Sequence, residues 1–123
     1  MLKSLLLLFV GGGLGAMLRF LIGKYSLQLF ETNFPIGTLV ANLVACILVG
    51  LFVYQFNLRL DVSQQALYLF LVIGFCGGLS TFSTFSIETF ELIKQGNIVF
   101  AILNVAISVG AGIASMAMLF KQH

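Results

Sequence analysis

Four stretches without a charged residue divide this chain, and their lengths limit what it can fold into. A helix needs about 20 mostly apolar residues to cross the roughly 30 Å hydrocarbon core of a bilayer. The first stretch is short by that criterion, but it extends to Gly23 because Arg19, near the helix end, can reach toward the interface. The stretches are Ser4–Leu18, Thr32–Leu58, Val62–Ile87 and Gln95–Phe120.

The sequence therefore predicts an all-α, multi-pass membrane protein with four transmembrane helices, at about residues 2–25, 34–56, 64–92 and 97–120. Only 8% of the 123 residues are charged and 60% are hydrophobic, whereas roughly a quarter of a soluble domain is charged. The loops are short and no linker occurs, so we expect residues 1–123 to form a single domain. The apolar N-terminus lacks a cleavage site before a polar region, and we interpret it as a retained span.

Several function classes find no support in the composition. The net charge of +2 is too small and scattered for a nucleic-acid partner. Cys46 and Cys76 fall inside spans, where we interpret them as small packing residues, and the single histidine is the last residue. No phosphate-cradling or catalytic motif is present, so we expect no enzymatic activity.

The third span is unusual, because it runs from Gln64 to about Leu92 and is longer than a straight crossing needs. Pro35 fits the start of the second span, and Asp61 or Ser63 can cap the third, with Gln64 completing a pattern like a capping box. Glycine costs about 1 kcal/mol relative to alanine inside a helix. We predict that this helix is broken in mid-membrane, near its cluster of glycines and hydroxyl residues; the alternative is a Gly/Ser packing face against another helix. The cluster consists of Gly74, Gly77, Gly78, Ser80, Thr81, Ser83, Thr84 and Ser86.

Lysine and arginine give no preferred orientation. If the N-terminus is cytoplasmic, Lys3, Arg59 and Lys121 lie on that side; Arg19, Lys24 and Lys94 lie on the other. Three against three leaves the positive-inside rule nothing to act on. We therefore predict insertion in both orientations and an antiparallel, dual-topology homodimer in the bilayer, with a single orientation set by weaker cues as the alternative.

Polar residues inside the spans form faces that favour an anion. Thr38 and Asn42 lie one turn apart, and Phe82, Phe85 and Glu88 share a face. Phenyl edges carry the positive end of the ring quadrupole, while cation pathways normally rely on intramembrane carboxylates. Interhelical hydrogen bonding is the alternative for each residue alone, but three polar faces together can line a narrow wet track. The face in the fourth span consists of Asn104, Ser108, Gly112 and Ser115.

Three motifs carry a resemblance to a known family. They are Gly-Gly-Gly-Leu-Gly-Ala-Met-Leu-Arg-Phe (residues 11–20), Gly-Thr-Leu-Val-Ala-Asn (37–42) and Gly-Phe-Cys-Gly-Gly-Leu-Ser-Thr-Phe-Ser-Thr-Phe-Ser-Ile-Glu (74–88). They resemble the CrcB/Fluc family of fluoride ion channels over the whole chain. The resemblance implies an antiparallel dimer with two fluoride pores and a central, structural sodium ion held by backbone carbonyls at the helix breaks.

The same resemblance implies a role for particular residues. Gly77 and Ser80 match the positions whose carbonyls hold sodium, and we expect a Cβ at Gly77 to disturb the backbone there. Arg19 and Glu88 are candidates for a vestibule. The residues that match or are placed along the fluoride pore are Asn42, Phe82, Ser83, Thr84, Phe85 and Ser108.

A channel of this kind would export cytoplasmic fluoride passively across the inner (plasma) membrane, down its electrochemical gradient. The main alternative is a small dual-topology multidrug transporter, which should carry an acidic residue in its first span; this chain has none there. A small scaffolding membrane protein is a third class, and it would not need aligned polar faces.

Overall fold

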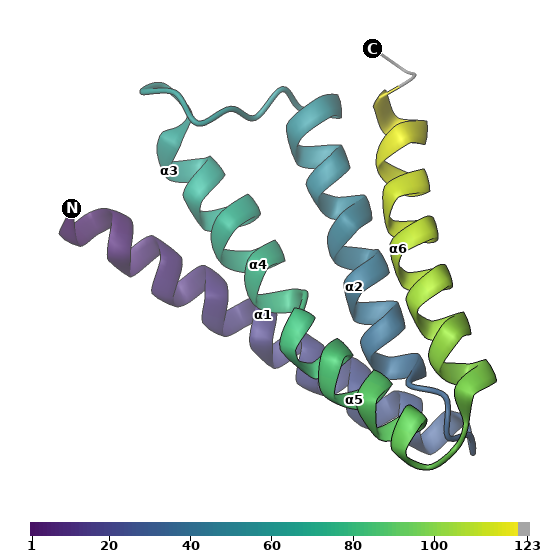
Figure 1. Ribbon diagram of the computed structural model, residues 1–123. Helices are drawn as coiled ribbons and strands as arrows, with labels where there is room; N and C mark the ends of the chain where they lie inside the picture. Colours follow the sequence, from purple (N-terminus) through teal and green to yellow (C-terminus); the bar gives the residue numbers. More distant parts are fainter. Residues whose placement is uncertain (121–123) are drawn as a thin grey trace.

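The computed structural model describes residues 1–120, and the described chain is helical apart from short connections. In Figure 1 the α1–α2 and α5–α6 connections lie together at the lower end of the molecule, and the loop after α2 and the end of α6 lie at the upper end. The four long segments therefore alternate in direction. In chain order the elements, with η for a π-helical segment, are α1 (Leu2–Leu29), α2 (Ile36–Gly50), η1 (Leu51–Gln55), α3 (Gln65–Tyr68), η2 (Leu69–Cys76), α4 (Gly77–Leu79), α5 (Phe82–Lys94) and α6 (Ile98–Phe120).

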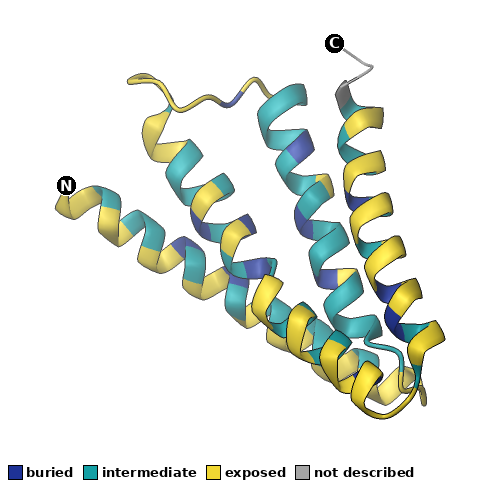
Figure 2. Cartoon of the chain, in the orientation of Figure 1, coloured by how far each residue is buried: buried dark blue, intermediate teal, exposed yellow. Residues whose placement is uncertain are grey.

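Four segments are long and apolar enough to cross a membrane, which confirms an all-helical chain with four candidate spans. Large apolar side chains are exposed along all four, and Figure 2 shows buried residues only as short bands. The first segment continues past Tyr25 to Leu29, because no proline or glycine interrupts it there. Lys121, used in the charge balance above, lies outside the described residues. The segments are Leu2–Leu29, Ile36–Gln55, Gln65–Lys94 and Ile98–Leu119.

Helix α1 crosses the third segment at very short range, and glycines make this crossing possible. A Cβ at Gly15 would overlap the carbonyl oxygen of Phe75, and a Cβ at Gly78 would overlap that of Gly12. Small residues let helix backbones approach closely in membranes. The packing face of glycines, given above as the alternative to a helix break, is therefore present on η2 and α4 against α1.

The most buried part of the protomer lies beside this crossing. Ala41 and Ala45 of α2 and Leu79 of α4 form its centre. The small side chains of Ala41 and Ala45 let α2 lie close to its neighbours, and Leu79 fills the space between them. Partly buried side chains that pack around them are Leu18, Ile22, Val44, Leu48 and Phe75.

The helical backbone of the third segment is interrupted at two residues after the glycines. Ser80 (φ −81°, ψ 155°) and Thr81 (φ −152°, ψ 112°) are extended, and α5 begins at Phe82. Gly77 has ordinary helical angles (φ −65°, ψ −36°), and a Cβ there would meet no atom within 4 Å. The expectation that Gly77 needs glycine for its own backbone geometry is therefore wrong for the protomer.

The turn before α3 is held by Asp61. Its Oδ1 accepts from the Ser63 hydroxyl at 2.8 Å and from the Gln64 N–H at 3.0 Å. Asp61 therefore caps the turn before the helix, whereas the N-cap of α3 is Gln64 and not Asp61 or Ser63 as predicted. The Gln64 side chain accepts from the N–H of Arg59, and not from that of Asp61 as in a capping box. The hydrogen bond from Ser63, then that from the Gln64 backbone, lowers the pKa of Asp61.

Candidate functional site

Asn42 and Thr81 connect α2 to the extended backbone between α4 and α5. The Thr81 N–H donates to Asn42 Oδ1 at 2.7 Å, and Asn42 Nδ2 donates to the Thr81 carbonyl at 3.4 Å. The side-chain amide thus satisfies both backbone groups of a residue that has left the helix. An amide NH₂ has two hydrogens, so one N–H of Asn42 remains available for another acceptor.

This arrangement changes the partners of two neighbouring carbonyls. In a continuous helix the Gly77 carbonyl would accept from the Thr81 N–H, and the Ser80 carbonyl from the Thr84 N–H. The first N–H donates instead to Asn42, and the second to Thr81 Oγ1 at 3.1 Å. The carbonyls of Gly77 and Ser80 therefore lack their helical donors.

Beside Asn42 lies a cavity of about 250 Å³, here called the Phe cavity. It brings together four of the six predicted pore residues, from three helical segments: α2, the third segment and α6. No Asp, Glu, Lys or Arg is among its lining residues, so its polar groups are amides, hydroxyls and backbone. The lining consists of Asn42, Cys46, Ser80, Thr81, Phe82, Phe85, Ser108 and Val109.

The two phenyl rings of this cavity lie side by side on α5. The ring centroids of Phe82 and Phe85 are 5.9 Å apart, with the planes tilted by 37°. Phe82 is 80% exposed, whereas Phe85 is half-buried. The protomer therefore supplies one wall for the rings and leaves Phe82 largely uncovered.

Ser83 and Thr84 are not among the residues that line the Phe cavity. Ser83 is exposed, and its hydroxyl lies 3.3 Å from that of Thr81. Thr84 lines a second cavity of about 550 Å³, here called the basic cavity because Arg19 and Lys24 also line it. Thr81 lines both cavities, so the Phe cavity and the basic cavity adjoin each other at this residue.

Arg19 fixes the end of α4 from α1. Its Nε donates to the Gly78 carbonyl at 3.1 Å, a carbonyl that would accept from Phe82 in a continuous helix. Arg19 thereby satisfies a polar group released by the interruption while its charge borders the basic cavity. The sequence did not reveal this contact, because residues 19 and 78 are far apart in the chain.

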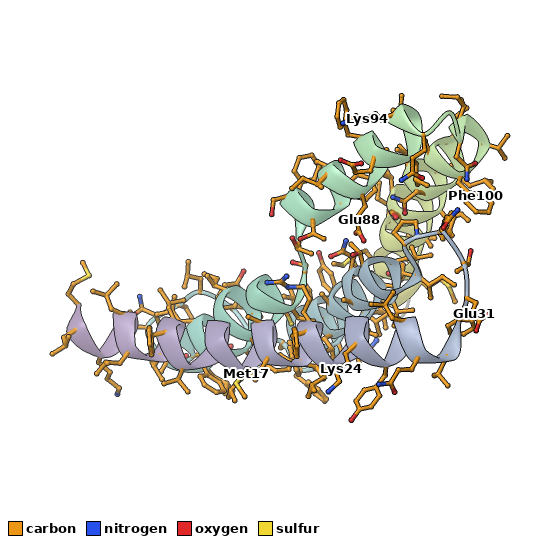
Figure 3. All side chains as sticks on the ribbon, turned by 90° about the horizontal axis from the view of Figure 1, so that it is seen from below. Met17, Lys24, Glu31, Glu88, Lys94 and Phe100 are labelled. Atoms are coloured by element: carbon orange, nitrogen blue, oxygen red, sulfur yellow. The ribbon has the colours of Figure 1, made fainter. Side chains whose placement is uncertain are left out.

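Glu88 lies on the side of α5 that faces α1 and α2. The Thr38 hydroxyl of α2 donates to Glu88 Oε1, and in Figure 3 Glu88 points from α5 toward α1 and α2. Both residues line a third cavity of about 160 Å³. Glu88 thus lines a different cavity from Asn42, Phe82 and Phe85.

The predicted polar face of α6 divides into parts. Ser108 lines the Phe cavity, whereas Asn104 is only 1% exposed. Asn104 donates a hydrogen bond to the hydroxyl of Thr89 on α5. The sequence analysis did not single out Thr89, although it follows Phe85 by four residues, or about one helical turn, and so lies on the same face of α5. Ser115 donates to the Gly112 carbonyl of its own helix and is not a lining residue of the Phe cavity.

Comparison with known proteins gives one family and relatives that share one name. The family described as "CrcB-like protein, Camphor Resistance (CrcB)" matches residues 6–120. A protein of Clostridium perfringens named Fluoride-specific ion channel FluC is 43% identical over 113 residues, covering 90% of this chain and 88% of that protein. Proteins with the same name from Phocaeicola vulgatus and Citrifermentans bemidjiense are 47% and 44% identical, covering 76% and 81% of this chain and 76% and 80% of their own lengths.

Proposed function

We propose that this chain, which belongs to the CrcB family, is a fluoride-selective ion channel of the plasma membrane. The resemblance carried by the three motifs is confirmed by the family match over residues 6–120. The structural observation that carries the proposal is the Phe cavity, where Asn42, Phe82, Phe85 and Ser108 come together without a charged side chain.

This lining suits a small anion in physical terms. Fluoride is strongly hydrated, so a pore must replace its water with closely placed positive groups. The free N–H of Asn42, the hydroxyls and the ring edges can do so without a full positive charge that would trap the ion. Conduction requires binding strong enough to admit the ion yet weak enough to release it.

The second half of the pathway is proposed to include the basic cavity. Arg19 and Lys24 give this cavity a positive field that attracts an anion. Thr81 and Thr84 lie on its wall, and Thr81 also lines the Phe cavity. Fluoride would therefore pass from a positively charged vestibule to a neutral, donor-lined segment. Glu88, bound to Thr38, would lie beside this route and tune its potential.

Direction follows from the membrane potential. Hydrogen fluoride enters cells uncharged and dissociates inside. One charge moved through 100 mV is worth about 2.3 kcal/mol, a concentration ratio of roughly 50-fold at equilibrium. A passive channel in an inside-negative cell therefore exports fluoride without an energy source.

The functional unit is proposed to be an antiparallel homodimer with two pores. The balance of three lysines and arginines on each side supports dual insertion. The exposure of Phe82 supports a partner as well, because a ring that is 80% exposed leaves one side of the pathway open. The interruption at Ser80 and Thr81 is proposed to be the mid-membrane break of the third helix. Non-helical backbone at that depth is tolerated only where it is buried in protein or lines a water-filled cavity.

A structural sodium ion is proposed at the centre of this dimer, held by the carbonyls of Gly77 and Ser80. The donor set fits, because both carbonyls lack their helical N–H partners, and hard cations prefer oxygen ligands. Carbonyls from both protomers would then coordinate the ion and stabilise the dimer. Ser80→Ala should keep function, since the ligand is backbone. A reversal potential for fluoride current that shifts with the sodium gradient would contradict a structural ion.

Growth tests the proposed function in cells. Expression should raise the fluoride concentration that stops growth of a bacterial strain without a fluoride exporter, and should leave resistance to cationic drugs unchanged. The reverse pattern would indicate a multidrug transporter. That class relies on an acidic residue in the first span, and α1 contains neither Asp nor Glu.

A further inference from the structure

Three hydrogen bonds in series connect two walls of the Phe cavity behind its surface. Ser108 Oγ on α6 donates to Asn104 Oδ1 at 3.3 Å, and Asn104 Nδ2 donates to Thr89 Oγ1 on α5 at 2.9 Å. Thr89 Oγ1 donates to the Phe85 carbonyl at 2.7 Å. This series, here called the polar relay, begins and ends at residues that line the cavity.

The direction of the polar relay is fixed by its donors. A threonine hydroxyl has one hydrogen, and that of Thr89 goes to a carbonyl, which can only accept. Thr89 must therefore accept from Asn104, which turns Nδ2 toward α5 and Oδ1 toward Ser108. The single hydroxyl hydrogen of Ser108 then points at Asn104 and away from the cavity.

Asn104 is held firmly in this orientation. It is 1% exposed, and a buried amide without partners is costly. The neighbouring seam between α5 and α6 contains an apolar cavity of about 410 Å³. Apolar side chains therefore do not fill this seam, and the bond from Asn104 to Thr89 is a direct link across it.

We infer that Asn104 is a positioning residue that keeps the Ser108 hydroxyl turned away from fluoride. To bind the anion through Ser108, the channel must first break the bond from Ser108 to Asn104. That exchange makes the net gain from Ser108 small, so the ion is bound weakly and leaves quickly. This inference rests on the proposed function, because it takes the Phe cavity as part of the fluoride pathway.

Asn104→Leu tests the inference, because leucine has a similar size and cannot accept from Ser108. The freed hydroxyl can then donate to fluoride, and hydrogen bonds to charged groups are worth more than neutral ones. We expect the half-saturating fluoride concentration of reconstituted protein to fall by about tenfold, while the maximal flux also falls. Adding Ser108→Ala to this variant should return the half-saturating concentration to the wild-type value or above.

A loss of packing alone would reduce the maximal flux without lowering the half-saturating fluoride concentration. A fall in both values therefore distinguishes a positioning role of Asn104 from a packing role. If Asn104→Leu does not fold, Thr89→Val removes the acceptor that keeps Asn104 Nδ2 turned toward α5. The amide can then turn Nδ2 toward Ser108, whose hydroxyl hydrogen becomes free, so the half-saturating fluoride concentration should fall as it does in Asn104→Leu. Thr89→Ser keeps the hydroxyl and should restore the wild-type values. Ser115→Ala, which removes a hydroxyl elsewhere on α6, is the matched control and should change neither value.

The results can overturn the role of Asn104 separately from the proposed fluoride channel function. A wild-type protein that carries no fluoride would overturn the proposed function. A wild-type protein that conducts, with an unchanged or higher half-saturating concentration in Asn104→Leu, or in Thr89→Val if Asn104→Leu does not fold, would overturn the role of Asn104 alone.

Discussion

The amide of Asn42 and the backbone of Thr81 bond to each other in both directions, with Oδ1 accepting at 2.7 Å and Nδ2 donating at 3.4 Å. One side chain thereby replaces the helical partners of a residue at the interruption. The same contact releases the Gly77 carbonyl from its helical donor and places an N–H of Asn42 at the Phe cavity. The interruption, the candidate sodium ligands and the candidate pore donor thus depend on one residue.

Asn42→Asp separates these roles. The carboxylate still accepts from the Thr81 N–H, but it has no N–H for an anion and adds a negative charge at the cavity. We expect the protein to fold and fluoride flux to fall to the background of empty liposomes. Asn97→Asp is the matched control, because Asn97 Oδ1 accepts from the Phe100 N–H away from the cavity, and its flux should be unchanged. Wild-type flux in Asn42→Asp would remove Asn42 from the pathway.

The phenylalanines of α5 give a second prediction. Phe82→Ile and Phe85→Ile keep an apolar side chain but remove the ring quadrupole that presents a positive edge. Each should reduce fluoride flux by orders of magnitude, with oligomeric state in detergent unchanged. Phe90→Ile, at an exposed ring of the same helix outside the cavity, should conduct normally. Normal conduction by both cavity variants would mean that these rings only pack.

The crossing of α1 over the third segment predicts a sharp difference between two glycines of α1. Gly15→Val forces a side chain onto the Phe75 carbonyl, whereas a Cβ at Gly13 meets nothing within 4 Å. Overpacking typically costs about 1–3 kcal/mol, and rigid backbone leaves little room for relief. The yield of monodisperse protein from membranes should fall for Gly15→Val and stay near wild type for Gly13→Val. Equal yields would contradict the close crossing.

Topology gives a further prediction. A C-terminal reporter active on only one side of the membrane should give a signal from both sides, since lysines and arginines are balanced. Two added lysines beside Arg59 should shift the population toward that loop inside the cell. A one-sided signal from the unmodified chain would contradict dual insertion.

The spans could be predicted from the sequence because long apolar stretches specify membrane helices. Helical spacing placed polar residues on one face within each span, whereas the assignment of Asn42, Phe82 and Phe85 to one pore came from the family resemblance. These three residues line one cavity together with Ser108. The glycines of the third segment were harder to interpret. They weaken a helix and also permit close packing, and the structure uses them for packing while the extended backbone follows at Ser80 and Thr81.

Contacts between distant residues could not be predicted. The bond from Arg19 to the Gly78 carbonyl and that from Asn104 to Thr89 depend on how whole helices cross. Ser83, expected at the pore, is not a lining residue of the Phe cavity, and its hydroxyl lies 3.3 Å from that of Thr81. The start of α5 at Phe82 sets which residues face the cavity.

Fluoride efflux from liposomes tests the central claim most directly. Purified protein is reconstituted with potassium fluoride inside, a potassium ionophore is added to carry the balancing charge, and external fluoride is followed with an electrode. We expect rapid efflux that stops when the ionophore is omitted, and no comparable efflux when chloride replaces fluoride. Liposomes that retain fluoride with ionophore present, or release chloride equally fast, would contradict a fluoride-selective channel.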